Sequence, residues 1–257
     1  MASASTVRHE VEAKLKGRIP SALTPAPRIA CQKIRVGISS VDELLQGGLP
    51  VGAITEMIGP ESSGRTSLAF SFLSQVTQQG KVCAWIDVSD SLHPESAAAA
   101  GIDLAHLLWI RCGTLRQRTS SPKPWSRLDQ ALRSADLLLQ AGGFSSIVLD
   151  LGSIAPEYAS RVPLAIWFRY RSAAERSQVS FILLTQHPCA KSSAELVLKL
   201  HQANASSHET TVFSGMHYRI ELVRDRSAQS NVVPLRKPPQ SEHTAAWHSR
   251  SPWAGCR

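Results

Sequence analysis

The stretch "GPESSGRTS", residues 59–67, decides how this chain is interpreted. It matches the phosphate-binding pattern G-x-x-x-x-G-K-[ST] at Gly59, Gly64 and Thr66, but the lysine position holds Arg65. Glycines let such a loop curl so that consecutive backbone N–H groups face a phosphate, and the N-terminus of the next helix adds partial positive charge. The stretch therefore predicts a phosphate-binding loop in which arginine replaces the usual lysine.

The flanking residues place this loop between a strand and a helix. "GAITEMIG" (52–59) is a short apolar strand, and "SLAFSFLSQVTQQG" (67–80) has the i, i+3, i+4 apolar spacing of a helix. Further strands are expected at 81–87, 107–112, 145–151 and 179–185, all parallel to the first, with helices at about 126–143 and 160–177 and closing strands at 195–202 and 217–225. This alternation predicts an α/β fold with a mostly parallel, twisted sheet and helices on both faces.

The two ends of the chain differ from this core in composition. Residues 1–35 hold one short helical pattern and then a Pro-broken stretch, so we expect a flexible N-terminal arm. Residues 36–226 form the expected core domain. Residues 227–257 are basic, Pro-rich and aperiodic, which predicts a disordered tail. Because Trp247 and Trp253 are unusual in such a tail, it is either leftover sequence or a short binding motif.

The composition narrows the class of protein. The chain has 257 residues, of which 43% are hydrophobic, as in globular proteins. No apolar run reaches the ~18 residues of a membrane span, and the N-terminus lacks the apolar region of a secretion signal. Five cysteines without C-x-x-C spacing favour reduced, buried thiols over metal binding or disulfides. We therefore expect a cytoplasmic protein with no membrane partner.

The candidate nucleotide site is the loop and its expected partners. The loop contributes Gly59, Pro60, Glu61, Ser62, Ser63, Gly64, Arg65, Thr66 and Ser67. The Thr66 hydroxyl is suited to Mg²⁺. Asp150, near the end of the buried strand "SSIVLDLG" (145–152), is placed like the acid that orders a metal's water shell in nucleoside triphosphatases. The alternative for Asp150 is an ordinary strand-end residue that caps a turn.

A long segment resembles the ATPase core of the RecA recombinase. The matching residues lie in "GGLPVGAITEMIGPESSGRTSLAFSFLSQVTQQGKVCAWIDVSDSLHPESAAAAGID" (47–103), and the likeness extends more weakly to Asp150 and to "FILLTQ" (181–186). The resemblance covers about residues 35–225 and implies a RecA-type P-loop NTPase core. It also implies ATP and Mg²⁺ as cofactors, and Gln186 as a sensor of the γ-phosphate.

Four departures from the RecA pattern affect functional positions. Arg65 replaces the loop lysine, and an arginine is a longer, planar fork that is not interchangeable with lysine. The water-activating glutamate is replaced by Ser89, and Asp90 would face the opposite side of a continuing strand. Ser96 replaces the tyrosine that stacks on adenine, and the DNA-binding loop at 187–194 is short. We therefore expect weak ATP and Mg²⁺ binding, with weak or absent hydrolysis.

The excess of Lys and Arg over Asp and Glu, 28 against 20, allows contact with DNA phosphates. The positive residues lie in 114–127, in Arg169 and Arg171, and in the two tails. By the RecA resemblance, 152–163 and 187–194 would be the DNA-facing loops, and the second is too short to wrap several nucleotides. We expect any DNA contact to be non-specific; a solvated basic surface stays open as the alternative.

A second resemblance accounts for these departures. "AAAAGIDLAHLLWIRC" (97–112) is similar to the ImuA proteins, RecA-like accessory factors of bacterial translesion mutagenesis. It implies a non-recombinogenic docking module whose partners are translesion polymerase subunits or RecA, with residues 1–35 and 234–257 as candidate docking arms. The first alternative is a divergent recombinase, a DNA-dependent ATPase. A signalling relative of the circadian-clock type ranks last, because it would need a loop lysine.

Overall fold

The computed structural model describes residues 6, 13–14, 32–113, 124–202, 204–208, 211–226 and 244–250. The chain divides into two compact units, Met1–Ala30 and Cys31–Arg257, and almost all described residues belong to the second. Most of the expected N-terminal arm and most of the expected C-terminal tail therefore lie outside the described residues.

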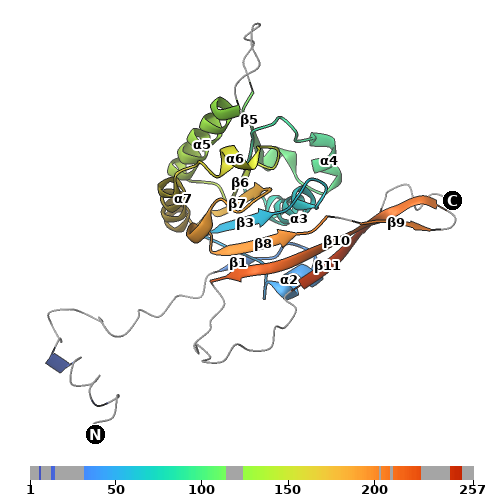
Figure 1. The fold of residues 1–257 in the computed structure, drawn as a ribbon, viewed down its shortest axis with the longest axis horizontal. Coiled ribbons are helices and arrows are strands. Elements are labelled where there is room, and N and C mark those ends of the chain that lie inside the picture. Colours follow the sequence, from blue (N-terminus) through green and yellow to red (C-terminus); the bar gives the residue numbers. More distant parts are fainter. Residues whose placement is uncertain are drawn as a thin grey trace. The chain divides into compact units, whose positions relative to one another are not determined.

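A mixed sheet forms the centre of the second unit (Figure 1). Its strands are β3 (Ile54–Ile58), β4 (Cys83–Asp87), β5 (Leu107–Arg111), β6 (Ser146–Asp150), β7 (Ser180–Thr185), β8 (Leu196–Leu200), β9 (Asn204–His208), β10 (Thr211–Asp225) and β11 (Thr244–Arg250). The strand order is β11-β10-β8-β3-β7-β6-β4-β5, and β9 also pairs with β10. Neighbours from β8 to β5 are parallel, whereas β10 is antiparallel to β8, β9 and β11.

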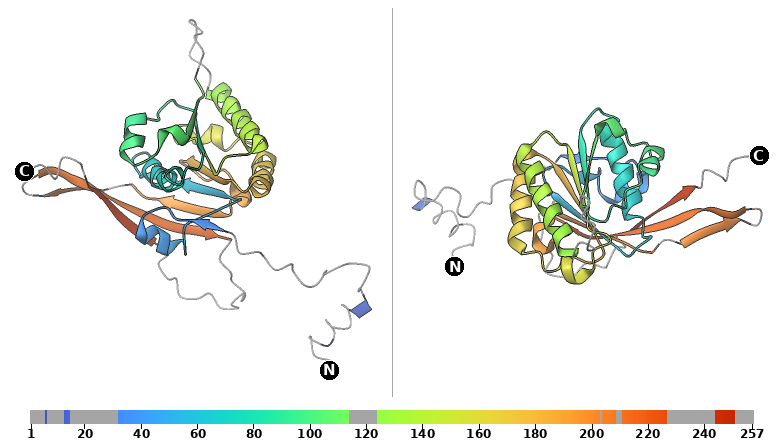
Figure 2. Two further views of the ribbon diagram at one scale, coloured as in Figure 1. Left: turned by 180° about the vertical axis from the view of Figure 1, so that it is seen from behind. Right: turned by 90° about the horizontal axis from the view of Figure 1, so that it is seen from above.

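Helices cover both faces of this sheet (Figures 1 and 2). The helices are α2 (Ser39–Leu44), α3 (Arg65–Thr77), α4 (Pro94–Ala99), α5 (Pro124–Ala141), α6 (Pro156–Ala159) and α7 (Leu164–Ser177), with short 3-10 turns η1 (Leu104–His106) and η2 (Lys191–Ser193). The short strands β1 (Lys33–Ile34) and β2 (Leu49–Pro50) pair separately. Helices α5 and α7 pack on one face, where Ile54 and Ile58 point, and α2 and α3 pack on the other, where Met57 points.

The predicted α/β fold with a mostly parallel sheet is confirmed. The strand before the phosphate loop and the four strands expected to be parallel to it are β3, β4, β5, β6 and β7, and all five share one direction. Strands β3, β4, β6 and β7 are buried almost throughout because helices cover both faces of the sheet, whereas β5, at the end of the strand order, is only partly buried.

One segment of the expected disordered tail differs from that expectation. Thr244–Arg250 forms β11 and pairs with β10, so that Trp247 lies opposite Tyr218. Pairing with β10 and the burial of Ala245 stabilise this strand. The seven-residue segment has too little alternation of apolar and polar residues for a strand to be predicted from the sequence. The residues on either side, 227–243 and 251–257, lie outside the described part of the chain.

The remaining expectations from composition concern cysteines and membranes. Among the described cysteines, Cys83, Cys112 and Cys189 are free and buried, as expected, and burial raises the pKa of Cys83 to about 12 and that of Cys112 to about 11. Across the described residues, no helix is both long and apolar enough to cross a membrane. The same residues contain no group of three or more His, Cys, Asp or Glu arranged to hold a metal.

Candidate nucleotide site

The loop Gly59–Thr66 joins the end of β3 to the N-terminus of α3, as the sequence predicts. Its first residue continues the strand, because the Gly59 N–H donates to the Thr185 carbonyl at 3.1 Å. The chain then curls through two left-handed residues, Ser62 (φ 59°) and Gly64 (φ 86°). A side-chain carbon on Gly59 would lie 2.6 Å from Ser63 Oγ, so the curl leaves no room for one.

Several hydrogen-bond donors of the loop have no acceptor among the described residues. Within the described part of the chain, the backbone N–H groups of Gly64, Arg65 and Thr66 donate to no acceptor, and no side chain caps the N-terminus of α3. Ser63 Oγ and Arg65 Nη1 are buried and likewise have no partner in the part of the chain that the structure describes. Unpaired N–H groups at a helix N-terminus attract anions, because they carry partial positive charge that adds to the helix dipole.

The Arg65 side chain reaches from the loop to the end of β6. It is only 8% exposed, and its Nη2 donates to the Gly152 carbonyl at 3.4 Å. Gln186 Nε2 donates to the same carbonyl at 2.8 Å. The structure therefore brings three predicted site residues, Arg65, Asp150 and Gln186, around one glycine. Thr66, by contrast, is exposed on the first turn of α3.

Asp150 lies beside the Arg65 guanidinium. Its Oδ1 accepts a hydrogen bond from the Gly152 N–H at 2.9 Å. A side-chain carbon on Gly152 would stand 3.0 Å from both Asp150 Oδ1 and Arg65 Nη1, so both groups flank the same small space. Burial raises the pKa of Asp150 to about 6, the Gly152 hydrogen bond opposes this, and the Asp87 charge adds to it. Burial likewise lowers the pKa of Arg65, which the Asp150 charge partly offsets.

This arrangement does not fit a divalent cation at the expected position. Mg²⁺ requires near-octahedral oxygen ligands at about 2.0–2.1 Å and usually keeps several waters. The Thr66 hydroxyl and the Asp150 carboxylate are suitable ligands by chemistry. The buried guanidinium of Arg65, however, flanks the same small space beside Gly152 as the carboxylate does, and like charges repel strongly where water is scarce. The cation beside Asp150 is therefore arginine.

The loop after β4 does not place an acid where a water-activating base is expected. The strand ends at Asp87, so it does not continue to Asp90, and the opposite-face position expected for Asp90 in a continuing strand does not arise. Asp90 turns outward with φ 58° and binds Arg111 through contacts of 2.6 and 2.5 Å. The fully buried Asp87 instead accepts the backbone N–H groups of Ser89, Ser91 and Leu92. Its carboxylate thus fixes the backbone that carries Ser89.

An aromatic pair that the sequence pattern did not reveal covers the loop from β10 and β11. The rings of Tyr218 and Trp247 are stacked, with centroids 4.6 Å apart and planes 19° apart. A side-chain carbon on Gly64 would lie 2.4 Å from Tyr218 Cδ1 and 2.6 Å from Cε1, so the Tyr218 ring rests directly on Gly64. The one signal in the sequence was the unusual Trp247.

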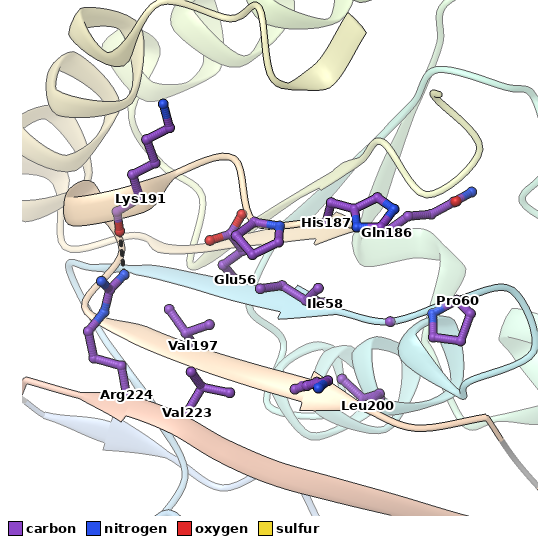
Figure 3. Close-up of a pocket in the computed structure, with 13 residues that line it drawn as sticks. Glu56, Ile58, Pro60, Gln186, His187, Lys191, Val197, Leu200, Val223 and Arg224 are labelled. Carbon is purple, nitrogen blue, oxygen red and sulfur yellow. Dashed lines mark hydrogen bonds between the residues drawn. The ribbon is translucent and has the colours of Figure 1, made fainter. Parts of the chain in front are cut away.

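A cavity of about 760 Å³ opens on the other side of the loop's first residues (Figure 3). Its walls come from the ends of β3, β8 and β10 and from the segment after β7. It touches the loop at Gly59 and Pro60 only, so it is distinct from the helix N-terminus that would cradle phosphate. The buried Glu56 accepts the N–H groups of Cys189 at 2.6 Å and Ala190 at 3.0 Å, which anchors the short segment after Gln186.

The basic residues expected to face DNA are largely engaged or outside the described residues. On α7, Arg169 pairs with Asp136 at 3.0 Å and Arg171 pairs with Glu195 at 3.3 Å. Residues 114–123 lie outside the described residues. Of the two expected DNA-facing loops, 152–163 contains the short helix α6, and 187–194 contains η2.

Comparison with known proteins places the chain in a family. Residues 16–159 match the family described as the RecA N-terminal domain. A "Protein RecA" of Brucella anthropi is 35% identical over 136 residues, which cover 52% of this chain and 34% of the relative. A "Protein RecA" of Crocosphaera subtropica is 36% identical over 113 residues, which cover 44% of this chain and 31% of the relative.

The fold and the site together define an α/β protein built around a strand–loop–helix unit of the P-loop type. The family match extends over more than half of the chain, and the chain therefore belongs to the RecA N-terminal domain family. The matched segments span about a third of the length of the two relatives. The family match ends at residue 159, before Gln186, which follows β7, and before the strands that carry Tyr218 and Trp247.

Proposed function

We propose that this chain is a RecA-like accessory protein of the bacterial DNA damage response that serves translesion synthesis as a docking module. The observation that supports this most is the position of Arg65, whose guanidinium contacts the Gly152 carbonyl and lies beside Asp150. A loop whose arginine lies beside Asp150, the acid expected to bind metal, keeps the backbone donors of a phosphate cradle but departs from a hydrolytic arrangement.

The residue at the catalytic position supports the same proposal. Ser89 cannot act as a general base at neutral pH, and general-base catalysis commonly contributes ~10²–10⁴-fold to a rate. The serine at position 96 offers no aromatic platform for a base, and stacking is worth ~1–3 kcal/mol per base in other nucleic-acid sites. We therefore propose weak ATP binding with turnover near background.

The proposed partners are translesion polymerase subunits or RecA, with DNA as a non-specific contact at most. Arg169 and Arg171 are less available to DNA phosphates than the sequence suggests, because each forms an ion pair with a carboxylate. The segment after Gln186 is short and anchored to Glu56, which leaves little backbone to follow a DNA strand.

The second candidate function is a divergent RecA recombinase, a DNA-dependent ATPase. The observation that favours it is the 35–36% identity to proteins named RecA, together with a loop that still joins strand to helix. DNA-stimulated hydrolysis separates the two candidates, since an accessory module with Ser89 in place of the base gains nothing from DNA.

A binding experiment with purified proteins tests the docking role. The tagged full chain is mixed with a translesion polymerase subunit or with RecA, and capture is compared with that of two shortened chains. One lacks residues 1–31, and the other lacks residues 251–257, which keeps β11 and its contact with β10. We expect the full chain to capture a partner and at least one shortened chain to lose it.

The other outcomes of this experiment have distinct meanings. Equal capture by the shortened chains would move the docking surface to the core domain. Failure of the folded full chain to capture any translesion polymerase subunit or RecA would contradict the docking role itself.

A further inference from the structure

Resting on the proposed nucleotide site, we infer that the loop binds the phosphate chain of a nucleotide without a divalent metal, using Arg65 as the built-in counter-ion. In this arrangement the side chain performs the charge neutralisation that Mg²⁺ performs in sites of related design. The metal site expected at Thr66 and Asp150 is then unnecessary for binding.

The first support is the unused hydrogen-bonding capacity of Arg65. A guanidinium has five N–H donors and no acceptor. Within the described residues, this side chain makes one long hydrogen bond, to the Gly152 carbonyl, and its buried Nη1 has no partner. An unsatisfied buried donor is costly, and a phosphate oxygen is a suitable acceptor for it.

The second support is the set of donors next to it. The unpaired N–H groups of Gly64, Arg65 and Thr66 and the unpaired hydroxyl of Ser63 belong to the same turn of chain. With the N-terminus of the 13-residue helix α3 behind them, they form an anion cradle that is complete without a metal.

The third support is the crowding at the expected metal position. The carboxylate oxygen Oδ1 of Asp150 accepts from the Gly152 N–H, and the guanidinium flanks the same space beside Gly152. A hydrated divalent cation in that space would meet the positive charge of Arg65. A phosphate bound next to Arg65 meets no such repulsion from it.

A calorimetric titration of the full chain with ATP tests this inference directly. One series contains excess Mg²⁺ and the other contains excess EDTA. We expect dissociation constants that agree within roughly threefold, a difference of about 0.6 kcal/mol. Inorganic triphosphate serves as a second probe, and it distinguishes recognition of the phosphates alone from recognition that needs the nucleoside.

Variants assign the effect to Arg65. Arg65→Met should weaken binding in EDTA by roughly 10-fold or more, because it removes a charge-assisted hydrogen bond. Arg65→Lys places a compact charge without the fork, frees the space beside Asp150, and should make Mg²⁺ tighten binding. Arg133→Lys, on the exposed face of α5, is the matched control and should behave as the native chain. Circular dichroism checks the fold of each variant.

The outcomes separate the inference from the proposed function. No ATP binding with or without Mg²⁺ would refute the nucleotide site altogether. ATP binding that is at least tenfold tighter with Mg²⁺ in the native chain would refute metal-free binding while leaving the nucleotide site standing. The native chain alone decides this, even if a variant at the buried Arg65 fails to fold.

Discussion

At the scale of single residues, the arginine at position 65, where the loop pattern has lysine, changes the environment of Asp150. The Arg65 guanidinium reaches the Gly152 carbonyl and neighbours Asp150, which is partly buried at the end of β6. An unpaired charge in such a place is disfavoured. The direction of the Asp150 shift shows that the guanidinium only partly offsets the loss of water.

The raised pKa of Asp150 predicts how stability depends on pH. An acid whose pKa is about 6 in the folded chain and 3.8 in the unfolded chain binds a proton more tightly when folded. Its contribution to stability is therefore present below the unfolded pKa and is lost as pH rises through about 6. Between about pH 4 and about pH 7 the loss should reach about 2–3 kcal/mol.

Urea unfolding of the native chain and of Asp150→Asn across this pH range measures that loss. The difference in unfolding free energy between the two chains should shift in favour of the variant as pH rises, since titrations common to both cancel. A difference that stays constant with pH would show that Asp150 titrates normally.

At the scale of elements, two antiparallel strands at the end of the sheet support the phosphate loop. Strand β10 supplies Tyr218, whose ring lies against Gly64, and β11 supplies Trp247, which stacks on that ring. Stacked aromatic pairs contribute about 0.5–1.5 kcal/mol beyond the area they bury. The loop is therefore held by strands that lie beyond the segment matching the family.

Gly64→Ala tests the contact between the loop and β10. The new methyl would meet the Tyr218 ring at 2.4 Å, and the backbone has φ 86°. We expect a loss of about 2–4 kcal/mol in unfolding free energy. Gly142→Ala is the matched control, because its φ is 69° but nothing lies within 4 Å, and it should cost about 1 kcal/mol. Chemical denaturation measures both; equal losses would mean that Tyr218 does not press on the loop.

The elements of this fold were predictable to different degrees. Fully buried parallel strands such as β3 and β7 are short, mostly apolar runs between turn residues, so their positions and common direction follow from the sequence. β11 was missed because its stability comes from pairing with a strand distant in sequence and not from its own pattern.

The candidate site was predictable only where local sequence determines geometry. The loop follows from its glycines and its position between strand and helix. The turn of Arg65 toward Gly152 depends on where β6 ends, and the pressure of Tyr218 on Gly64 depends on the order of strands. Such contacts between distant segments cannot be derived from spacing in one sequence.

At the scale of the whole molecule, the family suggests a nucleotide-hydrolysing protein, whereas the chemistry of the candidate site favours binding without hydrolysis. The chain belongs to the RecA N-terminal domain family, and its loop Gly59–Thr66 joins a strand to a helix N-terminus. In the same molecule, Arg65 lies beside the acid expected to bind metal, and Asp87 fixes a turn that presents a serine in place of a base. We therefore propose a RecA-type core that binds and docks without turning over nucleotide.

Steady-state ATP hydrolysis with and without single-stranded DNA tests this central claim most directly, with a RecA protein measured in parallel. We predict a rate near background that DNA does not raise. Ser89→Glu alone should not restore turnover, because Arg65 and Ser96 remain. Hydrolysis by the native chain that DNA stimulates to a level comparable with RecA would contradict the accessory role and favour a working recombinase.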